Sequence, residues 1–147
     1  MGTLASAEGF GALIGAVVIA STNIRYHGRV YLGGSMVGLI AVIVFSVSRS
    51  YSLSLPVLIV LGLGTSGFGT MQGVIVMLMA REDMRGRALG VMSIAIGAAP
   101  LGALMIGGIA STASAPFAIG LHGVLGITSL SLVALLMRSL WQRTAPE

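Results

Sequence analysis

Residues 53–80 read LSLPVLIVLGLGTSGFGTMQGVIVMLMA and contain no charged side chain. A helix needs about 20 apolar residues to cross the hydrocarbon core of a bilayer, which is about 30 Å thick. At a rise of about 1.5 Å per residue, this segment is longer than the core, and tilt or an outer end at Pro56 would absorb the excess. The stretch therefore predicts a membrane-spanning helix.

Four further runs of this kind accompany it, at about residues 2–21, 30–48, 88–111 and 117–137. The connections between the runs are short and carry charged, Ser, Thr or Pro residues, which suit turns. The first run lacks the basic start of a signal peptide, and four more runs follow it. We therefore expect an all-α helical bundle of five transmembrane helices, forming a single membrane domain over residues 1–147 with a cytoplasmic tail at 138–147.

The composition excludes several classes of protein. Of the 147 residues, 56% are hydrophobic and only 8% are charged, whereas a soluble domain carries about 25% charged residues. The net charge of +4 comes from a few scattered arginines and does not form the dense basic face that nucleic-acid binding requires. We therefore expect no soluble domain and no nucleic-acid partner.

Catalysis and cofactors are not expected either. The chain has no cysteine, so a disulfide, a thiolate nucleophile and a Cys-based metal site are all excluded. The two histidines, His27 and His122, are far apart in the sequence and have no second ligand type at metal spacing. Nucleophile–base–acid sets and phosphate-binding loops are also missing. The sequence predicts a protein that is not an enzyme and holds no metal and no cofactor.

The arginines predict the orientation. With five antiparallel spans, Arg49 lies on one side of the membrane and all other arginines lie on the opposite side, at positions 25, 29, 81, 85, 87, 138 and 143. Short cytoplasmic loops carry an excess of Arg and Lys. This distribution predicts an amino terminus outside and a carboxyl terminus in the cytoplasm.

Small residues at four-residue spacing occur along the spans. The pairs are Gly11 with Gly15, Gly34 with Gly38, and Gly69 with Gly73. In lipid such small faces let helix backbones approach closely and gain dispersion contacts. They favour a tight bundle, although a chain with 22 glycines also contains such pairs by chance.

The middle of the central span, residues 62–73, is polar and rich in glycine. Polar side chains that face lipid lack hydrogen-bond partners, so this segment is expected to face other helices or a water-filled cavity. Two interpretations stay open: a substrate path, or hydrogen bonds to neighbouring helices. The substrate-path candidates are Thr65, Ser66, Thr70 and Gln72.

A break is predicted in the fourth run. Pro100 lacks a backbone N–H and follows Gly97 at close range, with Gly102 just beyond it. A kink there suits a gating role, but proline kinks also occur in membrane helices that have none. The helix-break candidates are therefore Gly97, Pro100 and Gly102.

Two ionisable residues fall inside the runs. Such groups are costly in a membrane and are functional candidates by default. Glu8 is the only acid within a run, and His122 lies a few residues into the last run from the same side. Both are candidates for proton coupling, and one interpretation is that they form a paired site. The alternative is that both lie at the level of the outer lipid headgroups.

Three stretches of the sequence resemble the major facilitator superfamily of transporters. Residues 81–90 join two spans and are followed by a glycine–proline break at 97–104, as they are around the eleventh span of that family, and residues 9–16 resemble its eighth span. The loop residues that carry the resemblance are Glu82, Asp83, Arg85, Gly86 and Arg87. On this mapping the five runs are similar to spans eight to twelve of a 12-span transporter.

A second loop of the family has an Asp-Arg-x-Gly-Arg core. The corresponding residues 24–29 keep Gly28 and Arg29, but Arg25 stands where the acid belongs. The charge relay that the full motif implies is therefore not carried over to this copy. Among members of the family, the chain most resembles bacterial exporters of small organic molecules or siderophores.

The resemblance implies a secondary active transporter in the bacterial inner membrane that moves a small organic solute by proton-coupled export. Such transporters bind their solute between two six-span halves. Five spans supply less than one half, so we expect the chain to be inactive alone and to need the remaining transporter helices or another membrane chain. The alternative is a small helical scaffold or regulatory subunit without transport activity.

Overall fold

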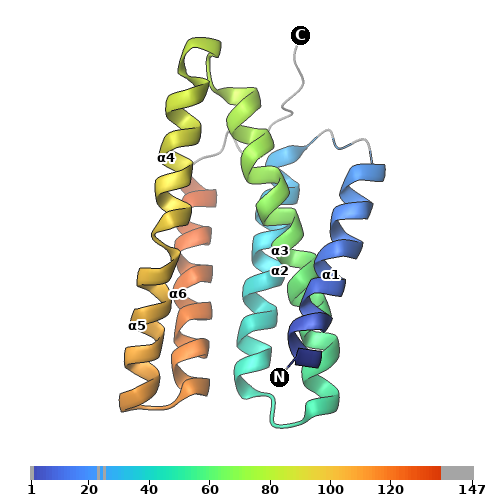
Figure 1. Ribbon diagram of the computed structural model, residues 1–147, viewed down its shortest axis with the longest axis vertical. Coiled ribbons are helices and arrows are strands. Elements are labelled where there is room, and N and C mark those ends of the chain that lie inside the picture. Colours follow the sequence, from blue (N-terminus) through green and yellow to red (C-terminus); the bar gives the residue numbers. More distant parts are fainter. Residues whose placement is uncertain (1, 23, 25, 137–147) are drawn as a thin grey trace.

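The computed structural model describes residues 2–22, 24 and 26–136. Within this part the fold is entirely helical (Figure 1). The helices are α1 (Gly2–Ser21), α2 (His27–Val47), α3 (Tyr51–Met79), the 3-10 helix η1 (Glu82–Met84), α4 (Arg85–Gly97), α5 (Ala99–Thr112) and α6 (Ala115–Leu136). Five helical stretches, with Glu82–Thr112 taken as one, are long and apolar enough to cross a membrane. The prediction of an all-α fold with five such stretches is confirmed.

Most boundaries lie close to the predicted ones, but two helices begin three residues early. α2 starts at His27 rather than at residue 30, and α4 starts at Arg85 rather than at residue 88. The arginines expected in loops, Arg29, Arg85 and Arg87, thus lie in first helical turns. A long arginine side chain can extend from such a turn to the polar interface, so its charge does not end the helix. The predicted tail at 138–147 and the last residue of the fifth run lie outside the described residues.

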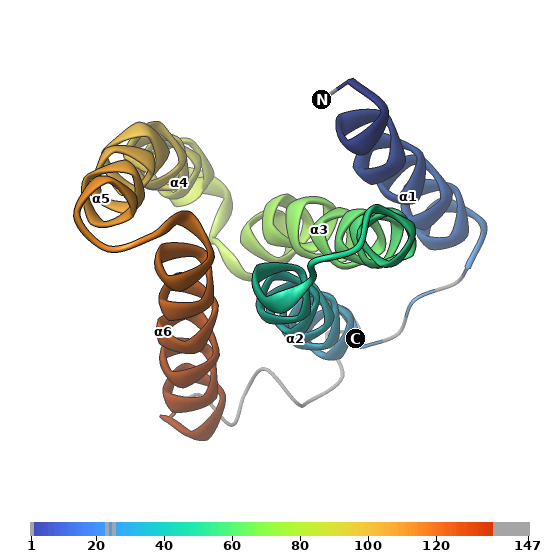
Figure 2. The same ribbon diagram turned by 90° about the horizontal axis from the view of Figure 1, so that it is seen from below.

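The helices form a curved layer, seen end-on in Figure 2. α3 packs against α1 on one side and α2 on the other, α2 packs against α6, and α6 packs against α5. Successive spans run in opposite directions, with α4 and α5 together making the fourth (Figure 1). The layer bends so that α4 and α5 lie across from α2 and α3, and α4 contacts α3 and η1.

Glycines bring α1, α2 and α3 into close contact. A Cβ atom at Gly11 would collide with the backbone of Ile59, and one at Gly62 would collide with the backbone of Glu8 and Ala12. We call this set the glycine seam; its members are Gly11, Gly15, Gly34, Gly38, Gly62, Gly64 and Gly67. Two of the three predicted pairs belong to it.

Several glycines outside the seam have no close neighbour. Gly69 and Gly73 have no atom within 4 Å of an added Cβ, so the third predicted pair is not a packing face in the described structure. The same holds for every glycine of α4 and α5, namely Gly86, Gly90, Gly97, Gly102, Gly107 and Gly108. Neither α4 nor α5 contains a buried residue.

The fourth span is interrupted at the position where the sequence predicts a kink. α4 ends at Gly97 and α5 begins at Ala99, with Ala98 between them at φ −79° and ψ −9°. Pro100 falls in the first turn of α5, where its missing N–H would have no partner inside that helix. The proline therefore begins a new helix and does not bend a continuous one.

Candidate functional site

A pocket of about 520 Å³ lies between α2, α3 and α6. Pockets for small molecules have volumes of about 300–1,000 Å³. On α2 the lining extends from Tyr31 to Val42, in the middle of that helix. On α6 it extends from His122 to Val133. The pocket therefore lies within the spans and away from their ends.

Glycines shape the back of the pocket. Gly34 and Gly38 of α2 meet Gly64 of α3, and all three line the pocket. A Cβ at Gly64 would lie 2.5 Å from the Gly38 nitrogen. Part of the glycine seam is thus also the floor of the pocket. The floor has no side chains at these three positions because the residues are glycines, which also lets α2 and α3 approach closely.

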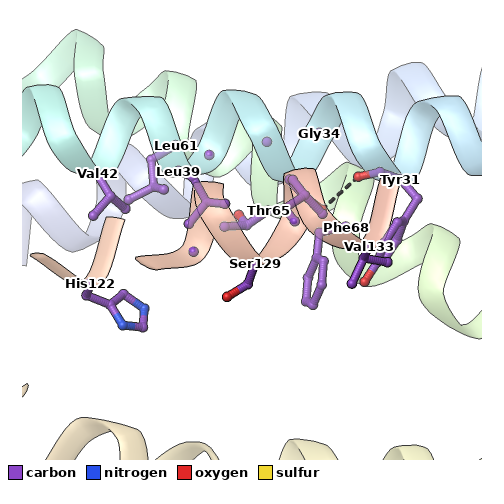
Figure 3. A pocket seen from close by; sticks show the side chains of 15 residues that line it. Tyr31, Gly34, Leu39, Val42, Leu61, Thr65, Phe68, His122, Ser129 and Val133 are labelled. Carbon is purple, nitrogen blue, oxygen red and sulfur yellow. Dashed lines mark hydrogen bonds between the residues drawn. The ribbon is translucent and has the colours of Figure 1, made fainter. Parts of the chain in front are cut away.

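An aromatic pair lies at one end of the pocket. The rings of Tyr31 and Phe68 have centroids 5.4 Å apart and are tilted by 32°. Phe68 is 40% exposed and lines the pocket. Figure 3 shows Phe68, Ser129 and His122 pointing to the same side of the layer.

The polar groups of the pocket fall into two kinds. The hydroxyls of Ser35 and Thr65 donate to carbonyl oxygens of their own helices, those of Tyr31 and Gly62, at 2.7 Å and 2.9 Å. By contrast, the Ser129 hydroxyl and the His122 imidazole have no hydrogen-bond partner among the described residues, and both face the pocket from α6. These two side chains are available to a bound molecule.

The four substrate-path candidates on α3 are not brought together. Thr65 lines the pocket, whereas Ser66 lines a smaller hollow of about 290 Å³ on the side of α1 and donates to the Leu63 carbonyl at 2.8 Å. Thr70 is exposed and Gln72 is half-buried, and neither lines the pocket. Thr65 and Ser66 donate their hydroxyls to carbonyl oxygens within α3, so neither hydroxyl depends on a hydrogen-bond partner from a neighbouring helix.

Glu8 and His122 do not form a pair. Glu8 is half-buried on α1, which contacts α3 but not α6 among the described residues. His122 is exposed on α6, at the pocket. α2 and α3 lie between the two helices (Figure 2).

The loop residues are paired locally. Glu82 contacts Arg85 at 3.7 Å, and Asp83 contacts Arg81 at 3.3 Å; all four side chains are more than one-third exposed. Arg29 lies over the ring of Tyr26 at 4.4 Å. Arg29, Arg81, Arg85 and Arg87 are at the same end of the layer, and Arg49 is at the other.

Four polar or aromatic residues of the lining are not among the candidates predicted from the sequence: Tyr31, Ser35, Phe68 and Ser129. None of the four belongs to a local sequence motif that indicates a binding site. For three of them the signal is helical spacing. Ser35 lies four residues after Tyr31 on α2, and Ser129 lies seven residues after the candidate His122 on α6. Helical spacing places each of these two pairs on one face.

No known protein family, no characterised protein and no solved structure matches the chain.

Proposed function

We propose that the chain is part of a secondary active transporter of the major facilitator type, and that the pocket between α2, α3 and α6 holds a small organic solute. The observation that carries this proposal is the pocket itself. It lies in the middle of helices apolar enough to span a membrane, and it presents an aromatic end and two polar groups that have no hydrogen-bond partner in the described part of the chain. Secondary transporters bind their solutes at this depth between packed helices.

The proposed transporter needs more protein than this chain. The pocket is open on one side, and α4 and α5 bury none of their residues. Alternating access requires two bundles that enclose the solute from opposite sides. We therefore expect the isolated chain in liposomes to move no solute, and we expect another membrane chain to complete the pocket.

The alternative, a scaffold or regulatory subunit, is favoured by one observation. The glycines of α4 and α5 have open space where a neighbouring helix would fit. A pure scaffold would need this face but not the pocket. The two proposals therefore differ in whether a change inside the pocket has any effect.

A chimera tests the transport proposal. Residues 2–136 would replace the last five spans of a proton-driven major facilitator exporter, and uptake of its fluorescent solute into inverted vesicles would be measured. Transport is expected from the chimera. Ser129→Trp is expected to abolish it by filling the pocket, whereas Thr128→Trp, on the adjacent position of α6 outside the lining, is expected to preserve it. A folded chimera that transports nothing, or equal transport by both variants, contradicts the proposal.

We propose that proton coupling, if present at this site, uses His122 and not Glu8, because only His122 lines the pocket. In the chimera, His122→Gln is expected to lower gradient-driven uptake at least tenfold, about 1.4 kcal/mol in rate terms, while solute exchange without a gradient continues. Glu8→Gln is expected to leave both activities unchanged. Loss of exchange together with uptake would mean that His122 serves binding alone.

The orientation is also a proposal, supported by the four described arginines at one end of the layer. The chain has no native cysteine, so Met84→Cys in η1 gives a single reporter at that end. A membrane-impermeant maleimide is expected to label it in inverted vesicles and not in intact cells. Labelling from outside intact cells would reverse the topology.

A further inference from the structure

We propose that the pocket between α2, α3 and α6 accepts an uncharged, elongated lipophilic molecule and discriminates against organic cations. This inference rests on the proposed function, because it names the class of solute for the same site. It narrows the small organic molecules or siderophores that the resemblance implies to one class, and it follows from the charges, length and shape of the pocket.

The charges come first. The whole chain has four acidic residues, Glu8, Glu82, Asp83 and Glu147. Glu8 lies on α1, on the far side of α3 from the pocket, and Glu82 and Asp83 form part of η1 beyond the spans; Glu147 is outside the described residues. The described pocket lining contains no carboxylate. An organic cation entering this apolar site would lose water without gaining a counter-charge, which is unfavourable.

Anions are disfavoured for a similar reason. No arginine or lysine lines the described pocket, and the whole chain contains no lysine at all. The Ser129 hydroxyl and the His122 imidazole can exchange hydrogen bonds with a neutral ligand. Two such groups in an otherwise apolar site suit a molecule with one or two polar atoms and no net charge.

The shape selects a long molecule. From Tyr31 to Val42 the lining follows eleven residue steps of α2, or about 16 Å at 1.5 Å per residue. The glycine floor is flat, because Gly34, Gly38 and Gly64 have no side chains above it. The Tyr31–Phe68 pair offers ring faces at one end, and His122 lies toward the other (Figure 3). A flat or rod-shaped ligand with an aromatic end fits this arrangement.

Three rod-shaped probe molecules that differ in charge test the predicted selectivity of the pocket. They are diphenylhexatriene, its trimethylammonium derivative and its propionate derivative. The purified chain in lipid nanodiscs would carry Ser129→Cys, and the rate of its reaction with N-ethylmaleimide would be measured with each probe. Uncharged diphenylhexatriene is expected to slow the reaction about fivefold, which corresponds to about four-fifths occupancy. The two charged rods are expected to slow it less than about twofold.

Thr128→Cys is the matched control. It lies next to Ser129 on α6, at the same membrane depth, but outside the pocket lining. Because all three probes also dissolve in lipid, this variant reports their effect on the bilayer, and its labelling is expected to be unchanged. Val133→Cys, at the aromatic end of the lining, is a second reporter expected to behave like Ser129→Cys, and Phe68→Ala is expected to remove the protection of both.

The outcomes separate the inference from the proposed function. Stronger protection by the cationic rod overturns the inference, even if the chimera transports. Equal effects on Ser129→Cys and Thr128→Cys also overturn it, because the hollow would then be a surface covered by lipid. Selective protection by the uncharged rod, together with an inactive chimera, supports the pocket chemistry and contradicts transport.

Discussion

The glycine seam and the α4–α5 segment contain the same residue type at similar spacing, but the structure uses it differently. In the seam, an added Cβ would meet backbone or side-chain atoms of a neighbouring helix. In α4 and α5, an added Cβ would meet nothing within 4 Å. The first set of glycines holds the helices together, whereas the second has no packing role in the described structure.

This difference shows that a small-residue pattern by itself does not identify an interface. Small residues permit close approach, but the approach also needs a neighbouring helix at the same level. α3 has two such neighbours along the seam, while α5 has α6 alone. Substitution of individual glycines can therefore separate the two regions.

The largest effect is expected within α3, from Gly62→Val compared with Gly69→Val. The two positions lie two helical turns apart, but only Gly62 meets the backbone of α1. Valine at 62 has to push α1 away from α3, which should lower the free energy of unfolding by about 3 kcal/mol or more. Valine at 69 should change it by less than about 0.5 kcal/mol. Thermal unfolding of both variants in the same detergent measures the contrast, and similar losses would mean that the seam is not the stabilising contact.

A smaller contrast is expected between two glycines that face each other. A Cβ at Gly64 would lie 2.5 Å from the Gly38 nitrogen, whereas a Cβ at Gly38 has its nearest neighbours at 3.8 Å, an ordinary contact distance. Gly64→Ala should therefore cost about 1–3 kcal/mol, and Gly38→Ala less than about 0.5 kcal/mol. Equal unfolding temperatures for the two variants would contradict the helix register that places them together.

The smallest effect, with the opposite sign, is expected in α4 and α5. Gly90→Ala and Gly107→Ala add a methyl group in open space and replace a poor helix former, so each should raise stability by up to about 1 kcal/mol. A clear loss of stability would show that this face is already covered, for instance by a second copy of the chain. Crosslinking of the purified protein before and after substitution would then identify the contact.

The five long apolar helices could be predicted because a hydrocarbon core of fixed thickness requires apolar runs of a certain length, and the sequence contains five such runs. The interruption near Pro100 could be predicted for an equally local reason, the missing N–H. The early starts of α2 and α4 could not, because the position of an arginine in the sequence does not show whether its side chain extends from a loop or from a first helical turn.

The pocket could not be predicted from local sequence patterns, because its lining depends on which helices become neighbours. No signal in residues 115–136 indicates that α6 packs against α2, so the positions of Ser129 and Tyr31 in one pocket lining are not visible in the sequence. One part could have been predicted. Successive helical residues point about 100° apart, so Thr65 and Ser66 point in different directions, and the polar strip on α3 is spread over more than one face of that helix.

The hydroxyl groups of the spans have a consequence for biogenesis. Ser35, Thr65, Ser66, Ser93 and Thr128 each donate to a carbonyl oxygen three or four residues earlier in the same helix. These bonds need only the helix itself, so they can form before any neighbouring helix is present. In the membrane protein that we propose, each of the five apolar helices can enter the bilayer with these hydroxyls already satisfied, and the seam between α1, α2 and α3 can close in a later step, by lateral encounter of inserted helices.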